Sequence, residues 1–61
     1  MISKIEREKW LRDNGFDYVS VNDYFVRRSD NTFVNSDGFV TRQVSAISVE
    51  FLGHFDDLGW I

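Results

Sequence analysis

The chain has 61 residues, enough for one small domain over residues 1–61, and 43% of them are hydrophobic while 28% are charged. This share of hydrophobic residues excludes an intrinsically disordered chain, and the charged residues leave no uncharged run long enough to cross a bilayer. The absence of cysteine excludes disulfides and thiolate metal sites, and a net charge of −3 gives no long-range attraction to nucleic acid.

Residues 4 to 13 predict a helix at the start of the chain. Ser3 and Glu6 have the spacing of a capping box, in which the serine hydroxyl accepts from the backbone at Glu6 and the glutamate reaches back to the cap. Strong helix formers follow, and an Asn-Gly pair can adopt the left-handed conformation that ends a helix. Because the apolar residues form no clean stripe, we expect Trp10 or Leu11 at the edge of the contact face.

Residues 16 to 40 predict short antiparallel strands, because they are rich in Val, Phe and Tyr and are interrupted by turn-forming residues. A three-residue hairpin loop that ends with a left-handed Asn31 pairs Val26 with Val34. A two-residue turn would instead pair Val26 with Asn35. We prefer the first register because it keeps two valines together on one face.

The segment over residues 42 to 52 fits two structures. Val40, Val44, Ile47 and Phe51 have helical spacing, whereas alternate residues of the same segment suit a strand. We predict a C-terminal helix, which gives an α+β fold with an N-terminal helix and a short antiparallel β-hairpin or meander. The alternative is a mostly β meander with one N-terminal helix.

The chain has no catalytic motif. Its glycines form neither a P-loop nor a dinucleotide fingerprint, and no serine has the local signature of a hydrolase nucleophile. The one histidine, His54, lies near Asp56 and Asp57 in a spacing that matches no metal-ligand pattern. We therefore expect no enzyme, no metal site and no cofactor.

The C-terminal region combines acidic and aromatic residues after Arg42, the last basic residue. On a helix, Phe51, Phe55 and Leu58 would form one apolar stripe, the pattern of a helix that enters a partner's groove. The alternative, which the small core favours, is that these side chains complete the protein's own core. In a mixed arrangement, Phe51 would lie inside the core and Trp60 outside it, on the surface. The candidate partner-binding residues are Phe55, Asp56, Asp57, Leu58, Trp60, Arg27 and Arg28.

A second hypothesis is a small nucleic-acid-binding protein that uses Arg27, Arg28, Arg42 and the basic N-terminal helix. Against it, adjacent residues of a strand point to opposite faces, so Arg27 and Arg28 cannot both line one groove without a bulge. A third hypothesis is a self-associating structural subunit, such as a homodimer, joined through exposed C-terminal apolar side chains.

A short, acidic chain without cysteine or a catalytic motif resembles, in this profile, the small inhibitor proteins of bacteriophages and mobile elements, anti-CRISPR proteins among them. Such a protein covers a functional surface of a larger one, and clustered carboxylates can occupy a phosphate-binding site. The N-terminus lacks the apolar run of a secretory signal, so we expect a cytoplasmic protein. Our leading hypothesis is a small acidic protein-binding module, an inhibitor or adaptor. Its expected partner is a larger protein, for example one that binds nucleic acid, with no direct contact to nucleic acid or membrane.

Overall fold

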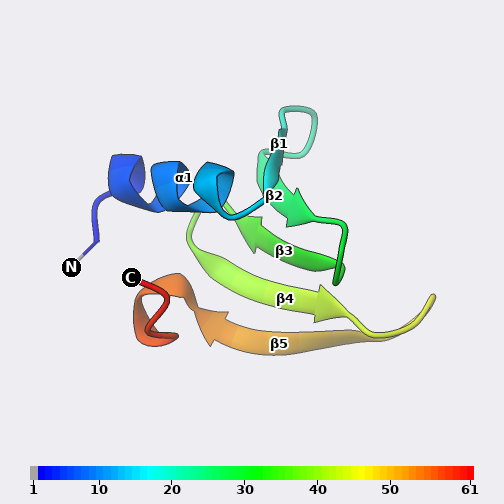
Figure 1. Ribbon diagram of the computed structural model, residues 1–61. Helices are drawn as coiled ribbons and strands as arrows, with labels where there is room; N and C mark the ends of the chain where they lie inside the picture. Colours follow the sequence, from blue (N-terminus) through cyan, green and yellow to red (C-terminus); the bar gives the residue numbers. More distant parts are fainter. Residues whose placement is uncertain (1) are drawn as a thin grey trace.

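A computed structural model describes residues 2–61, which form one helix and a five-stranded antiparallel sheet (Figure 1). The elements are α1 (Lys4–Asp13), β1 (Asp17–Val19), β2 (Tyr24–Arg27), β3 (Thr32–Asn35), β4 (Phe39–Gln43), β5 (Val49–His54) and a 3₁₀ turn, η1 (Phe55–Asp57). The strand order is β1-β2-β3-β4-β5, so each strand pairs with its neighbours in the chain. The predicted α+β class is confirmed, but the only helical element after β5 is the short η1.

Helix α1 begins and ends where the sequence predicts. The N–H of Glu6 donates to Ser3 Oγ at 3.1 Å, and the Glu6 carboxylate accepts from the Ser3 hydroxyl at 3.2 Å. At the other end, the N–H of Asn14 donates to the Trp10 carbonyl at 3.0 Å, after which the chain leaves the helix. Leu11 is buried and Trp10 is half-buried at its side, so the expected edge position belongs to Trp10.

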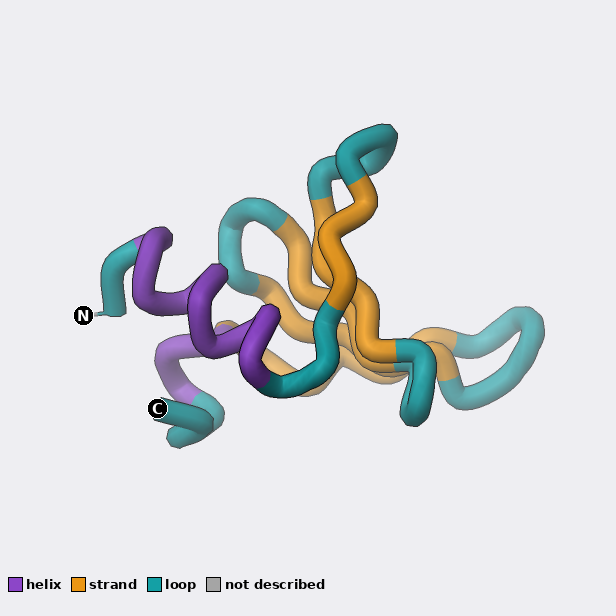
Figure 2. The backbone as a smooth tube through the Cα atoms, turned by 45° about the horizontal axis from the view of Figure 1, so that its top comes forward, coloured by secondary structure: helices purple, strands orange, loops and turns teal. Residues whose placement is uncertain are grey.

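Helix α1 and the C-terminal residues contribute to the core on one face of the sheet, and Figure 2 shows α1 beside the strands. Val34 of β3 pairs with Phe25 on one side and with Val40 on the other, which forms a row of buried side chains under the helix. The core consists of Leu11, Phe16, Phe25, Val34, Val40 and Phe55. We call this side of the sheet the helix face.

The predicted register of the β2–β3 hairpin is wrong by one residue. Val26 pairs with Phe33 rather than with Val34 or Asn35, because the loop has four residues, 28–31, between the paired ends of the strands. A shift of one residue moves every side chain to the other face. Val34 therefore enters the core, while Val26 lies on the opposite side of the sheet.

The contacts of the loop explain its length. The Arg27 guanidinium donates two hydrogen bonds to the Asp30 carboxylate, at 3.2 and 2.9 Å, and so bridges the loop. Asn31 has a φ of 57°, the left-handed conformation that the sequence predicts for it. A four-residue loop with these contacts allows the left-handed Asn31 and also places Val34 in the core.

The prediction of a helix over residues 42–52 is wrong, because this segment forms the end of β4, a loop and most of β5. Gln43 pairs with Val49, and the pairing continues toward His54 with one irregularity beside Val40. Strand pairing gives β4 a hydrogen-bonding partner on its second side.

The C-terminal residues fold back against α1. The Trp60 ring stacks on Trp10, with centroids 5.1 Å apart and planes 17° apart, and it meets Phe55 edge-on at 5.6 Å. Phe55 is completely buried. The arrangement with Phe51 inside and Trp60 outside is wrong in both parts, because Trp60 closes the core beside α1 and Phe51 is exposed on the other side of the sheet.

Candidate protein-binding surface

No element within residues 2–61 covers the sheet face opposite α1, which carries aromatic and aliphatic side chains. We call this surface the open face; it is formed by Tyr24, Phe33, Phe39, Val49 and Phe51. Phe39, Val49 and Phe51 are 44%, 64% and 63% exposed, and the other two residues are half-buried. These are large apolar areas for so small a domain.

The strand register places these side chains on one side of the sheet. Directly opposite residues in antiparallel strands project to the same face. Phe33 lies opposite Thr41, and Thr41 lies opposite Phe51. Phe39 and Val49 are each two residues from a member of this row, so they project in the same direction.

Aromatic contacts order the open face. The Phe39 ring lies 6.1 Å from Phe51 and 5.3 Å from the His54 ring, and Tyr24 lies 5.5 Å from Phe33. These centroid separations are typical of favourable aromatic pairs. The strand register brings no Lys, Arg, Asp or Glu of β3, β4 or β5 to this face. The part of the open face over these three strands is therefore uncharged and has aromatic anchors, like the centre of a protein interface, while Asp17 of β1 lies on the same face opposite Val26.

Arg27 stabilises the β2–β3 hairpin through two contacts. Its Cζ lies 4.7 Å from the centroid of the Phe16 ring, while the same guanidinium binds Asp30. The hydrogen bonds from Arg27 hold the pKa of Asp30 below its ordinary value. Arg28 lies in the exposed loop after β2, so the two adjacent arginines do not form one surface.

Arg42 joins Arg27 on the helix face, because both residues lie opposite Thr32 in the register. The Nη2 atom of Arg42 is 3.3 Å from Oε2 of Glu50 on the neighbouring strand. Each of these two arginines is therefore paired with an acidic side chain. The charges at this end of the sheet balance rather than forming a cationic groove.

The structure brings most of the predicted C-terminal binding residues to the core. Phe55 is completely buried, and Leu58 and Trp60 pack against the core cluster. Asp56 is half-buried, and Asp57 is exposed. Of these five candidates, Asp57 is the one with an exposed position.

Sequence reasoning missed Phe39 and Val49, and it placed Phe51 in a helical stripe for a partner's groove or, in the alternatives, in the core. The signal that could have found them is the alternation of residue types along the segment, which we weighed against the helical spacing and set aside. On a strand, Val49 and Phe51 share one face, and the hairpin returns that face beside Phe39. The open face thus depends on the strand interpretation of this segment.

His54 has a structural role at the end of β5. Its Nε2–H donates to the Asp37 carbonyl at 2.9 Å, and its Nδ1 accepts from the Asp56 N–H at 3.1 Å. Both ring nitrogens are thus engaged by backbone groups. Within residues 2–61 no cluster of three or more His, Asp or Glu side chains is placed to hold a metal ion.

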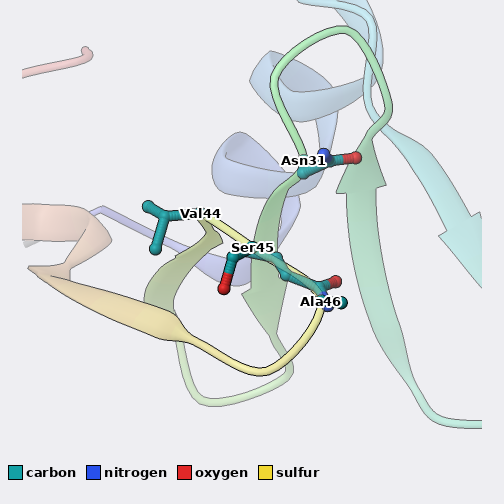
Figure 3. A pocket seen from close by; sticks show the side chains of 5 residues that line it. Asn31, Val44, Ser45 and Ala46 are labelled. Atoms are coloured by element: carbon teal, nitrogen blue, oxygen red, sulfur yellow. The ribbon is translucent and has the colours of Figure 1, made fainter.

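A shallow pocket of about 350 Å³ lies between the start of β3 and the β4–β5 loop; it is lined by Asn31, Gln43, Val44, Ser45 and Ala46. Figure 3 shows Asn31 across from the loop residues. The lining holds no carboxylate, imidazole or amine. The Ser45 hydroxyl therefore has no general base in the lining, and the pocket has no acid–base pair for catalysis.

None of the helices described within residues 2–61 is both long enough and apolar enough to span a bilayer. No protein-family model, no curated protein and no solved structure matches the chain. The open face is therefore the feature of the molecule from which we infer its function.

Proposed function

We propose that the protein is a small protein-binding module, an inhibitor or adaptor that covers a functional surface of a larger protein with its open face. The observation that carries the proposal is the exposure of Phe39, Val49 and Phe51 on the part of the open face over β4 and β5, to which these strands bring no charged side chain. The core occupies the other face of the sheet, so these side chains contribute little to the fold. Exposed apolar patches on small domains commonly mark interaction surfaces.

The size of the molecule suits such a role. Its two longer dimensions are 32 and 23 Å, so one broad face has about the area, ~800 Å², that each partner buries in a standard interface. Full burial of a Phe side chain contributes roughly 1.5–3 kcal/mol relative to full exposure. Because Phe39 and Phe51 are about half exposed, each would contribute about 1 kcal/mol or more on binding.

The nucleic-acid alternative has less support. Arg27 and Arg42 are each paired with an acidic side chain, and the net charge of −3 opposes binding to phosphates. The profile of small phage and mobile-element inhibitors agrees with a protein partner. An inhibitor of a cytoplasmic protein is the form of the proposal that we favour.

A capture experiment tests the proposal. The tagged protein is incubated with a lysate of the organism that encodes it or of that organism's host, with and without nuclease. We expect a defined protein to be captured after nuclease treatment, and capture to fall about tenfold or more in the double variant Phe39→Ser/Phe51→Ser.

The matched control is Ile5→Ser, which removes a side chain that is 81% exposed on α1, away from the open face. This variant should capture the partner like the wild type. Capture that disappears with nuclease would favour the nucleic-acid hypothesis. Capture that survives the double substitution would place the interaction on another surface and contradict the proposal.

A further inference from the structure

Strand β5 is one edge of the sheet, and Figure 1 shows no element beyond it. The other edge, β1, has three residues, whereas β5 has six. An edge strand presents backbone N–H and C=O groups that have no partner in the sheet. Short edges limit this exposure, and β5 is the longest strand of the protein.

The hydrogen bonds of the hairpin identify which backbone groups of β5 face outward. The N–H of Val44 donates to the Ser48 carbonyl at 3.0 Å, so the backbones of these two residues face each other, as in the hydrogen-bonded pairs of a hairpin. Such pairs alternate along antiparallel strands. Glu50 is then the next residue whose backbone faces β4, while the backbone groups of Val49 and Phe51 face away from the sheet.

The other side of β4 gives the same alternation independently. The N–H of Gln43 donates at 3.0 Å to the carbonyl of Asn31, the residue directly before β3, so the backbone of Gln43 faces the β3 side. The backbone of Arg42 consequently faces β5, where it lies opposite Glu50. Two hydrogen bonds on different strands thus agree that Val49 and Phe51 present four backbone groups at the edge.

A second copy of β5 is a poor occupant for this edge. The symmetric antiparallel pair that uses the outward groups of both residues places Val49 of one copy opposite Phe51 of the other. The Glu50 side chains of the two copies then lie directly opposite each other. Like charges in this position destabilise a strand pair. Glu50 thus acts against pairing of the protein with itself.

The same glutamate favours a strand with a positive charge. Arg42 binds only Oε2 of Glu50, and half of the Glu50 side chain remains exposed at the edge. A lysine or arginine on an added strand, directly opposite Glu50, would lie on the helix face beside this carboxylate. The neighbouring positions of the added strand would lie on the open face beside Val49 and Phe51.

We infer that β5 is a docking strand for an extended segment of a partner protein, which adds antiparallel to it with the pattern apolar–basic–apolar. The basic residue lies opposite Glu50, and the two apolar residues lie opposite Val49 and Phe51. Backbone hydrogen bonds hold the segment, and the alternate side chains select it. This inference rests on the proposed function and names how the partner is recognised.

Two blocked pentapeptides, Thr-Val-Lys-Val-Thr and Thr-Val-Glu-Val-Thr, are the probes. In millimolar lysine peptide, we expect hydrogen exchange of the Val49 and Phe51 amides to slow by about tenfold or more. The lysine peptide should bind about threefold more tightly than the glutamate peptide, and Glu50→Lys should reverse this preference. Amide exchange and chemical shifts measured by NMR give both results.

Val49→Pro provides a second test, because it removes an outward N–H without breaking a bond to β4. It should abolish peptide binding and leave the melting temperature near that of the wild type. Val49→Thr, the matched control, keeps the N–H, so it should still bind the peptide, with only the smaller loss that a less apolar side chain at this contact causes. The inference is overturned if neither amide slows in the lysine peptide, or if both slow with protein concentration alone, which would make a second copy the occupant.

The captured partner separates this inference from the proposed function. If both are correct, Val49→Pro and Phe39→Ser/Phe51→Ser each abolish capture. If Val49→Pro still captures the partner while the phenylalanine variant does not, the open face binds without strand addition and the edge inference fails. If both variants capture it, the proposed function fails as well.

Discussion

Trp60→Ala tests whether the C-terminal residues belong to the core or remain available to a partner. In the structure, Trp60 stacks on Trp10 at 5.1 Å and meets Phe55 edge-on at 5.6 Å. It is the second-last residue of the described chain, where fraying is ordinarily expected. Its contacts predict instead that its removal destabilises the whole domain.

The expected magnitude follows from the area that Trp60 buries. Aromatic side chains bury about 150–250 Å² when they are enclosed, so the half-buried Trp60 buries roughly 120 Å². At ~25 cal/mol per Å² this area contributes about 3 kcal/mol, and the aromatic pairs add about 0.5–1.5 kcal/mol. A domain of 61 residues has a total stability of roughly 3–9 kcal/mol. The substitution therefore removes about a third of the stability or more.

Urea and thermal unfolding followed by circular dichroism measure this effect. We expect Trp60→Ala to lower the melting temperature by more than about 10 °C. The matched variant, Phe51→Ala, removes an aromatic side chain that is 63% exposed and should cost less than about 1 kcal/mol. A larger loss for Phe51→Ala than for Trp60→Ala would refute this assignment of core and surface.

Three further substitutions test the turns. Gly38 has a φ of 93°, and a Cβ there would lie 2.8 Å from Nε2 of His54, so Gly38→Ala should cost about 1–3 kcal/mol. Gly59 has a similar φ, 71°, but a Cβ there would have no atom within 4 Å. Comparing the loss of unfolding free energy in Gly59→Ala and Gly38→Ala therefore separates the cost of backbone strain from the cost of the close contact with His54. Arg27 lowers the pKa of Asp30 in the folded state, so the pair stabilises the fold above the ordinary pKa and this contribution disappears as pH falls through the lowered value. Asp30→Asn should therefore cost less than about 1 kcal/mol near neutral pH and nothing in strong acid; an equal loss at both pH values would contradict the ion pair.

The parts of the fold that the sequence predicts correctly are those whose signals are local. Ser3 and Glu6 lie one helical turn apart, so their mutual contacts form within α1 without help from the sheet. The left-handed Asn31 likewise reflects a preference of one residue type in a turn. Such local interactions depend on only a few consecutive residues, so they can be predicted from the sequence, and the structure contains them.

The register of the β2–β3 hairpin could not be chosen from local preferences alone. Two-, three- and four-residue loops are all common, and the pairing of two valines is the criterion that local sequence offers. In the structure, Val34 instead lies between Phe25 and Val40, because three strands and α1 must share one core. The choice of loop therefore depends on β4, which follows in the chain.

The candidate surface depends on a still more distant effect. Phe51 and Phe55 are four residues apart, so on a regular strand they would project to the same face. The irregular pairing between Val40 and Thr41 shifts the register within β5. As a result, Phe55 lies in the core while Phe51 lies on the open face. Helical spacing had suggested that these two aromatic residues act together, and the irregularity separates them.

The β4–β5 loop offers a direct test of helix against hairpin. A helix over residues 42–52 would place Val44 and Ile47 on the same stripe as the buried Val40, and truncating them would cost several kcal/mol, as for other core side chains. In the structure they are 55% and 96% exposed, so Val44→Ser/Ile47→Ser should change the free energy of unfolding by no more than about 0.5 kcal/mol per site. Val40→Ala is the matched control, because both arrangements bury Val40, and it should cost about 2 kcal/mol or more. If urea unfolding shows the double variant to be as unstable as Val40→Ala, the segment packs as a helix, and the open face described for β4 and β5 does not exist.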